Sequence, residues 1–222
     1  MKKRSLIIAL AISVAMCFGA FQSVFADTWS EKPTEKQVED VTYHFMDEVN
    51  EGKYKVVSTD TLKSWIDKGT KMVIVDTMPA ESSYNKRHVP GAINAEAPMK
   101  EEDYSAEQKA NLIKQLPTKT VKKTTWKKVS KSTYKKLGKS SRKVKTVKGK
   151  KTYYKKVVKK STVKDKNYRI VVYCGHIGCP RSHWAAKYLV KQGYKNVYRY
   201  GGGISAWAAA GYGTEAVTEA AE

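Results

Sequence analysis

The segment from residue 170 to 182 constrains this chain more than any other part of the sequence. Four β-prone apolar residues, Ile170 to Tyr173, predict a buried strand that ends at Cys174. A loop containing two glycines follows, and helical spacing then predicts a helix from Ser182 to Gln192. A thiol in this position faces free backbone N–H groups and the positive end of a helix dipole, and both lower a thiol pKa. We therefore expect Cys174 to be a nucleophile.

The same alternation of short strands and helices occurs along the rest of the chain. Strands are predicted at residues 54–57, 72–75, 170–173 and 196–200, with helical patterns between them. A helix that begins with a capping box at Ser105 is stopped by Pro117. This alternation predicts an α/β fold, in which helices flank a parallel sheet and ligands bind at the carboxyl ends of the strands. Asp76 follows the second strand and would lie at that edge.

The two ends of the chain differ from this pattern. Residues 1–26 have a basic start, an apolar run and small residues before Ala26, which predicts a signal peptide cleaved after Ala26. The mature protein would then be periplasmic, envelope-bound or extracellular; the alternative is an uncleaved membrane anchor, although the apolar run is short for a span. A helix is predicted over residues 34–53, and the acidic tail at residues 213–222 is predicted to be disordered.

Residues 118–166 interrupt the α/β domain, which would occupy residues 54–117 and 167–212. Residues 119–166 contain 21 Lys and Arg residues and one acid, whereas the remaining chain carries 21 basic and 20 acidic residues. The β-branched and aromatic content allows short hairpins around Gly138 and Gly149; the alternative is disorder in the absence of a partner. The segment is either a solvated variable loop or a site for a polyanion, such as a cell-wall polymer, an anionic lipid surface or nucleic acid.

Three sequence blocks of the α/β domain form a recognisable set. Residues 76–92 read Asp-Thr-Met-Pro-Ala-Glu-Ser-Ser-Tyr-Asn-Lys-Arg-His-Val-Pro-Gly-Ala, residues 171–182 form the strand and loop at Cys174, and residues 193–207 close the domain. Together these blocks resemble the rhodanese-like family, whose signature combines Asp-x-Arg, Glu, Tyr and His-Ile-Pro-Gly-Ala with a cysteine loop. The resemblance spans roughly residues 54–212 without the insertion, and it implies a rhodanese-like parallel sheet.

The resemblance also implies a sulfurtransferase. Cys174 would take sulfur from a small donor such as thiosulfate or a polysulfide, hold it as a persulfide and pass it to a thiol acceptor, and we expect no cofactor. Backbone N–H groups would curl into a nest for the anionic sulfur, because glycines accept positive φ. This anion-binding loop would contain Gly175, His176, Ile177, Gly178, Arg181 and Ser182, where Arg181 either attracts the donor anion or fixes the loop.

The loop departs from the family pattern in its length and in its second cysteine. The usual loop has four residues between its cysteine and an Arg-Ser pair, but here Cys179 stands in the arginine position and Arg181 follows two residues later. Met78 also replaces the arginine of the Asp-x-Arg pattern. Cys179 is either a resolving thiol for Cys174 or its partner in a disulfide. We expect a redox-active pair, because a disulfide closing so short a loop would stabilise by only about 2 kcal/mol.

Three polar residues near the predicted site have alternative roles. His176 is either a base or cationic neighbour of Cys174 or a solvated loop residue. Asp76 either hydrogen-bonds to the loop or is structural, and His88 is expected to cap and pack its Val-Pro-Gly turn. No group of residues has the spacing of a metal site.

These features lead to three functional hypotheses. The first is an exported rhodanese-like sulfurtransferase with Cys174 as the sulfur carrier. The second is a non-enzymatic envelope module, in which the domain is a scaffold for the polyanion-binding residues 119–166. The third is a thiol-disulfide oxidoreductase that uses Cys174 and Cys179.

Overall fold

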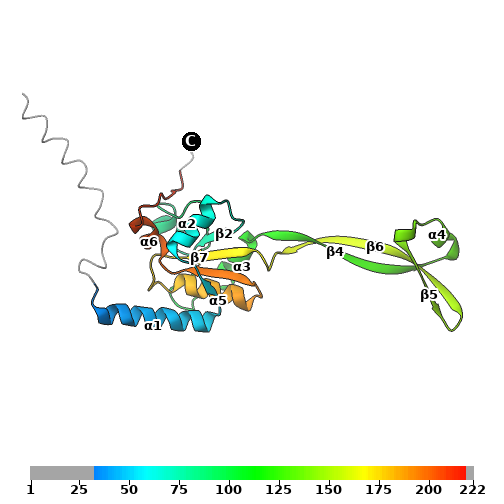
Figure 1. Ribbon diagram of the computed structural model, residues 1–222, viewed down its shortest axis with the longest axis horizontal. Coiled ribbons are helices and arrows are strands. Elements are labelled where there is room, and N and C mark those ends of the chain that lie inside the picture. The colour runs from blue at the N-terminus through cyan, green and yellow to red at the C-terminus, as the bar shows by residue number, and fades with distance from the viewer. Residues whose placement is uncertain (1–32, 219–222) are drawn as a thin grey trace, which may run out of the picture. The chain divides into compact units, whose positions relative to one another are not determined.

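The computed structural model describes residues 33–218 and gives the predicted α/β domain a five-stranded sheet (Figure 1). All neighbouring strands are parallel, in the order β1-β8-β7-β2-β3. The strands are β1 (Lys55–Val56), β2 (Val73–Asp76), β3 (Ala92–Asn94), β7 (Arg169–Tyr173) and β8 (Asn196–Tyr200). The predicted fold class, a parallel sheet flanked by helices, is confirmed.

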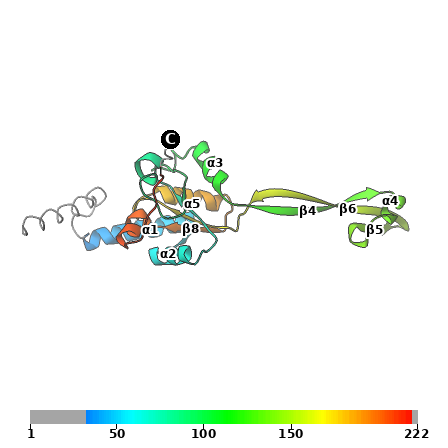
Figure 2. The ribbon, with the colours of Figure 1, turned by 90° about the horizontal axis from the view of Figure 1, so that it is seen from above.

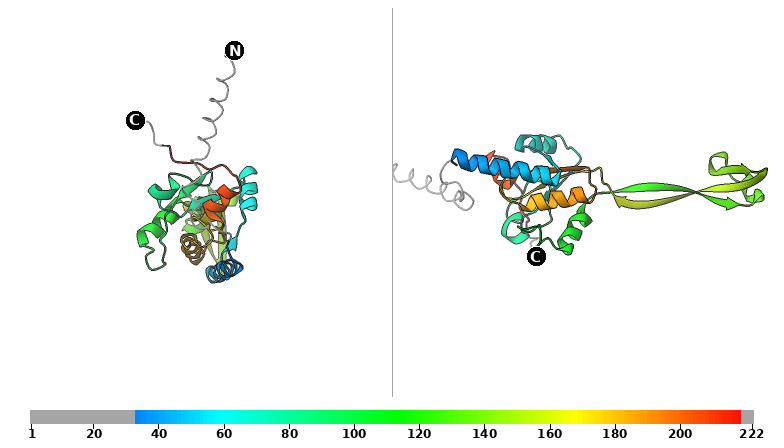
Figure 3. Two further views of the ribbon diagram at one scale, coloured as in Figure 1. Left: turned by 90° about the vertical axis from the view of Figure 1, so that its left-hand side faces the viewer. Right: turned by 90° about the horizontal axis from the view of Figure 1, so that it is seen from below.

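Helices cover both faces of the sheet (Figures 2 and 3). Successive residues of β7 alternate between two cores, because side chains of a strand point to opposite faces. Ile170 and Val172 belong to the core that includes residues of α3 (Ala106–Gln115) and α5 (Arg181–Lys191). Val171 and Tyr173 belong to the core that includes residues of α2 (Thr59–Asp67) and α6 (Gly203–Ala209). The central strand is therefore buried on both sides, as its unbroken apolar sequence predicts.

Helix α1 runs from Glu35 to Gly52 and crosses the boundary between two compact units, which lies between His44 and Phe45. In the first unit, the backbone N–H of Thr34 donates to Gln37 Oε1 at 2.8 Å, and the N–H of Gln37 donates to Thr34 Oγ1 at 3.3 Å. This reciprocal pair has the geometry of a capping box and starts the helix. In the second unit, Val49 packs against the core that includes α3 and α5.

Local sequence signals explain where several elements begin and end. Ser105 Oγ accepts from the N–H of Gln108 at 3.1 Å and Gln108 Oε1 accepts from the N–H of Ser105 at 3.2 Å, which confirms the predicted capping box. Helix α3 then ends at Gln115, two residues before Pro117. Two elements of the α/β domain were not predicted: the three-residue strand β3 and a π-helical turn at Ala80–Tyr84. Both are too short to produce a periodic pattern.

Residues 118–164 form a second, antiparallel sheet, in the order β4-β6-β5. Its strands are β4 (Thr118–Val129), β5 (Arg142–Val147) and β6 (Lys150–Lys164), and we call them, with α4 (Lys131–Lys135), the basic ribbon. A hairpin at Gly149 matches the expectation, with positive φ at Lys148 and Gly149 as a type I′ turn requires. The expected hairpin at Gly138 is wrong, because α4 and a 3-10 turn (Lys139–Ser141) lie there and β4 pairs with β6 instead.

The predicted disorder of the acidic tail is wrong for its first residues. The backbones of His88 and Glu215 exchange hydrogen bonds at 2.8 and 3.0 Å, and the N–H of Val217 donates to the Asn85 carbonyl at 2.9 Å. The predicted signal peptide and the end of the tail, within residues 1–32 and 219–222, lie outside the described residues. Over residues 33–218, no helix combines the length and the apolar character needed to cross a membrane.

A candidate active site with two cysteines

Cys174 follows directly after β7, the central strand of the parallel sheet. β2 and β8 flank β7, so chain connections diverge at this point, where open α/β sheets bind their ligands. Cys174 and Cys179 are both free thiols, 1% and 5% exposed. The structure thus brings the two predicted cysteines together in one loop, where both side chains are buried and no disulfide joins them.

The Cys174 thiol has close polar neighbours. Its Sγ lies 3.0 Å from the carbonyl oxygen of Cys179 and 3.2 Å from Ser182 Oγ. Burial raises the pKa of the Cys174 thiol well above its ordinary value, and the adjacent Cys179 raises it further. The predicted lowering of the pKa at Cys174 is therefore wrong, because desolvation outweighs the hydrogen bonds from Ser182 at the start of α5.

Cys179 has the lowered pKa instead. A hydrogen bond from the Cys174 thiol lowers the pKa of Cys179 to about 6, and the backbone N–H groups of Gly175 and Arg181 act in the same direction. The Cys174 thiol donates to the Cys179 carbonyl oxygen at 3.0 Å. The two shifts have opposite directions, so Cys179 loses its proton more readily than Cys174.

The loop between the cysteines is closed by hydrogen bonds of its own. The N–H of Gly178 donates to His176 Nδ1 at 3.2 Å, and the N–H of Cys179 donates to the His176 carbonyl at 3.0 Å. Gly175 and Gly178 are not among the glycines with positive φ. Two N–H groups of the predicted nest are therefore used within the loop in this conformation, and the nest for an anionic sulfur stays a prediction. His176 and Ile177 are exposed at the loop tip.

Arg181, the first residue of α5, fixes the loop to the segment that follows β3. Its Nη1 donates to the carbonyl oxygen of Ala97 and lies 3.7 Å from a carboxylate oxygen of Glu96. Of the two roles expected for Arg181, these contacts match the structural one.

Arg199, on β8, is a supporting residue that sequence reasoning missed. It is fully buried, and its Nε donates to Ser182 Oγ at 2.9 Å. Its Nη2 donates to the carbonyl oxygens of Cys179, at 3.0 Å, and Ile177, at 3.4 Å. Its Nη1 donates to Glu48 at 2.5 Å and to the Tyr54 hydroxyl at 3.2 Å.

These contacts occupy all the N–H donors of the Arg199 guanidinium. Because Ser182 Oγ accepts from Arg199, its own hydrogen is free to point at Cys174 Sγ. One signal could have identified Arg199, which is the one charged residue of a predicted strand. A charged side chain that is buried in a sheet needs partners, so this position could have been expected to form polar contacts.

Gly203, at the start of α6, holds the backbone at Cys174 in place. Its φ is +60°, and a Cβ atom there would lie 2.3 Å from the Cys174 carbonyl oxygen. The N–H groups of Ile204 and Ser205 donate to the carbonyl oxygens of Cys174 and Gly175, both at 3.0 Å. Only glycine combines this close approach with a left-handed backbone.

The other two predicted site residues stabilise turns. Asp76 Oδ1 accepts from the N–H of Met78 at 2.8 Å, within its own turn and not from the cysteine loop. Burial raises the pKa of Asp76 to about 6, and within residues 33–218 its Oδ2 has no hydrogen-bond partner. His88 lies 2.8 Å from the Tyr84 carbonyl through Nδ1 and stacks on the Tyr84 ring at 4.1 Å. Asp76 thus has a structural contact within its own turn, while these side-chain contacts of His88 are with Tyr84 and not with the Val-Pro-Gly turn that it was expected to cap.

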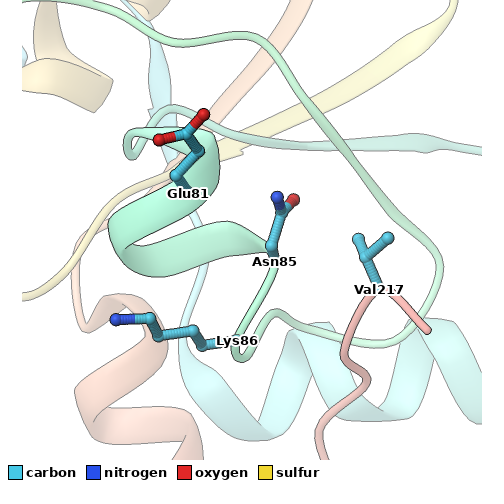
Figure 4. Close-up of a pocket in the computed structure, with 4 residues that line it drawn as sticks. All are labelled: Glu81, Asn85, Lys86 and Val217. Atoms are coloured by element: carbon cyan, nitrogen blue, oxygen red, sulfur yellow. The ribbon is translucent and has the colours of Figure 1, made fainter. Parts of the chain in front are cut away.

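A surface pocket of about 570 Å³ contains neither cysteine. Figure 4 shows its lining side chains, which are Glu81, Asn85 and Lys86 from the π-helical turn and the residues after it, and Val217 from the C-terminal segment. In the part of the chain that the structure describes, no three His, Cys, Asp or Glu side chains are grouped as metal ligands.

Comparison with known proteins places these features in one family. The family model described as the rhodanese-like domain matches residues 58–155 and residues 130–210. No curated protein matches the chain.

Solved structures with a similar fold include three from bacteria. A Bacillus halodurans protein is 18% identical, with 81% of this chain and 87% of that chain covered and a TM-score of 0.42. The rhodanese-like domain of an Anabaena protein is 20% identical, with 75% of this chain and 86% of that chain covered and a TM-score of 0.40. A thiosulfate sulfurtransferase from Pseudomonas aeruginosa is 15% identical, with 80% of this chain but 23% of that chain covered and a TM-score of 0.47.

Proposed function

This chain belongs to the rhodanese-like domain family, and from that premise we propose that it is a sulfurtransferase that carries sulfane sulfur as a persulfide on Cys174. The observation that carries the proposal is the pair of buried free thiols in one loop at the end of the central strand. Cys174 follows the central strand directly, and the lowered pKa of Cys179 fits it to accept the Cys174 proton. A thiol with a high pKa is thereby supplied with its own base.

The reaction follows from this proton arrangement. The Cys179 thiolate takes the proton of Cys174, and Cys174 Sγ attacks the outer sulfur of the donor. A new S–S bond forms, the donor's S–S bond breaks, and the donor remnant leaves with the electron pair, as sulfite if thiosulfate is the donor. Cys174 then carries an anionic persulfide and Cys179 is a neutral thiol, so the loop does not hold two negative charges.

Transfer to an acceptor returns the pair to its starting state. An acceptor thiol attacks the outer sulfur of the persulfide, and Cys174 leaves as a thiolate. Cys179 then returns the proton to Cys174. Throughout the cycle, the Ser182 hydroxyl, held by Arg199, is placed to donate a hydrogen bond to the Cys174 sulfur.

Mass spectrometry after incubation with thiosulfate or a polysulfide tests this proposal. We expect an adduct of about 32 Da, one sulfur atom, on the peptide that contains Cys174. Cys174→Ser should abolish the adduct, whereas Cys179→Ser should retain it. Absence of the adduct from the unmodified protein with every sulfur donor would falsify the proposal.

A second candidate is thiol-disulfide exchange, which the low pKa of Cys179 favours. The Cys179 thiolate would attack a substrate disulfide and release one thiolate. Cys174 would then displace the second thiol and leave a Cys174–Cys179 disulfide. Thiol counting with and without reductant tests this candidate, and two thiols that stay free under oxidising conditions would exclude it.

We also propose that residues 119–166 tether the protein to anionic polymers, and that the protein is exported after cleavage at Ala26. Residues 119–166 contain 21 basic side chains and one acid, and this excess of positive charge supports the tether. Deletion of residues 118–166 should abolish salt-sensitive retention on cell envelopes; unchanged retention would contradict the tether. Export predicts that the N-terminus of the native protein is Asp27. If the tethered protein takes up no sulfur, the α/β domain is instead a scaffold for the ribbon.

A further inference from the structure

One face of the basic ribbon carries two aromatic rings among lysines. In the strand register, Trp126 lies opposite Lys156, and Tyr154 lies between Lys128 on β4 and Lys143 on β5. Trp126, Tyr154, Lys143 and Lys145 line a groove of about 190 Å³. We call this the Trp126 face; its aromatic and basic residues include Lys122, Trp126, Lys128, Lys143, Lys145, Lys150, Tyr154, Lys156 and Lys160, and its exposed valines are Val147 and Val158.

Packing of the ribbon does not explain the exposure of Trp126. On the opposite face, Tyr153 packs against Tyr134 at 4.8 Å, and the Arg142 guanidinium lies 5.0 Å from the Tyr134 ring. Trp126 instead remains 40% exposed, with Lys143 Nζ at 5.8 Å from its ring. Its ring is therefore available to a ligand.

The charges of the ribbon are not neutralised within it. Three cross-strand pairs place lysine opposite lysine, which destabilises an antiparallel sheet: Lys122 with Lys160, Lys123 with Lys159, and Lys127 with Lys155. Asp165, the one acid of residues 119–166, lies at the base of the ribbon, 2.8 Å from Lys119. Anions from outside the ribbon are needed to relieve this repulsion.

We propose that the Trp126 face binds a single-stranded nucleic acid, with phosphates against the lysines and a base stacked on Trp126. Proteins that bind single strands combine a basic track with exposed aromatic rings, because every base offers a flat face to stack. A duplex hides those faces and would use the lysines alone. The inference rests on the proposed polyanion tether and narrows it to one ligand class.

The arrangement of the ribbon fits other polyanions less well. An anionic bilayer favours apolar side chains gathered on one face. Here the four exposed valines are divided equally, since Val147 and Val158 lie on the Trp126 face while Val144 and Val163 lie on the other. A polymer without rings would gain from the lysines but not from Trp126.

Fluorescence anisotropy of the full-length protein tests the inference with labelled oligo-dT and an abasic phosphodiester of equal length. These probes carry the same charge and differ only in their bases. Trp126→Ala should weaken oligo-dT binding by about 5-fold or more, the effect of losing one stacked base, and leave abasic binding within about twofold. Trp126→Phe should restore most of the affinity for oligo-dT.

A matched pair of charge variants tests which face is used. Lys128→Gln with Lys143→Gln removes two charges from the Trp126 face, and Lys123→Gln with Lys159→Gln removes two from the other face. The first double variant should lose more oligo-dT affinity than the second.

Several results would overturn the inference. Equal losses from the two double variants, or equal effects of Trp126→Ala on both probes, would mean that the ribbon binds by charge alone. Heparin or phosphatidylglycerol vesicles binding as tightly as oligo-dT would identify another occupant, while the tether itself would stand. If no polyanion binds at all, the tether is wrong as well.

Discussion

The α/β domain and the basic ribbon differ in the surroundings of their positively charged side chains. In the domain, Arg199 is fully buried with an acceptor for each N–H group, and Lys187 contacts both Glu51 and Glu101. On the ribbon, lysine lies opposite lysine and the charges are exposed. The same kind of side chain therefore fixes geometry in one region and is left for an external anion in the other. Burial and partners, not the number of cations, decide the role.

The largest difference is expected between one cation from each region. Arg199→Gln removes the buried guanidinium from Glu48 and should lower the free energy of unfolding by about 3–5 kcal/mol. Lys143→Gln removes an exposed ribbon charge and should change it by less than about 0.5 kcal/mol. Urea denaturation measures both free energies of unfolding. Equal losses would contradict the conclusion that burial and partners decide the role of a cation.

Two glycines with positive φ, one in the α/β domain and one in the ribbon, allow the two regions to be compared by substitution. Gly203→Ala places a Cβ against the Cys174 carbonyl and should cost about 2–4 kcal/mol, and it should also change the rate at which Cys174 is alkylated. Gly149→Ala, at the ribbon turn, meets no atom within 4 Å. It should cost only about 1–2 kcal/mol from the left-handed backbone. An effect of Gly149→Ala on Cys174 alkylation would contradict the separation of the two regions.

Two aspartates should respond to pH with opposite signs. The pKa of Asp76 is raised from 3.8 to about 6 in the fold, so the folded state binds this proton more tightly and loses stability as pH rises through that window. The shift corresponds to at most about 3 kcal/mol. Asp76→Asn keeps the acceptor for Met78 and should therefore gain stability over the unmodified protein as pH rises.

Asp165, at the base of the ribbon, provides the control. The hydrogen bond from Lys119 lowers the pKa of Asp165, so its contribution is present above the unfolded pKa and is lost as pH falls. Asp165→Asn should therefore slightly destabilise the protein at neutral pH. Melting temperatures at about pH 4 and about pH 7 test both variants, and a shift of the same sign would contradict the assignment.

The smallest expected effect is a change in rate at the cysteine pair. Cys179→Ser removes a hydrogen bond and a charge that, after burial, raise the pKa of Cys174. The pH midpoint for alkylation of Cys174 should therefore fall. In the unmodified protein, alkylation of Cys179 should rise through about pH 6. Peptide mass spectrometry separates the two sites, and an unchanged midpoint for Cys174 would show that the thiols are not coupled.

Local patterns in the sequence were sufficient for much of the fold. Strands β2, β7 and β8 lie where short apolar runs predicted them, and the strand-loop-helix order correctly placed Cys174 near Ser182. The role of Arg199 was not predictable in this way. Its partners come from α1, the cysteine loop and the start of α5, which are distant from β8 in sequence and meet it only after folding.

The errors have the same physical origin. The pKa of Cys174 depends on burial, which the loop sequence does not reveal. In the ribbon, the β-prone sequence was recognised, but the pairing of β4 with β6 joins residues from 24 (Val129 with Tyr153) to 46 (Thr118 with Lys164) positions apart. The helix near Gly138 had a local signal that was overlooked, since Ser130 Oγ accepts from the N–H of Thr133 at 3.2 Å as an N-cap.

The base of the ribbon has a consequence for folding kinetics. Thr118 pairs with Lys164, and the N–H of Asp165 donates to the Pro117 carbonyl at 2.9 Å, so the chain leaves and re-enters the domain at nearly one point. Loop-closure cost grows with the logarithm of length, and reducing roughly 50 residues to a few lowers it by about 2 kcal/mol. Hairpins form in roughly 1–10 microseconds, before most domains complete folding. If the ribbon forms first, β7 can pair with β2 at nearly the loop-closure cost of a chain without the ribbon residues.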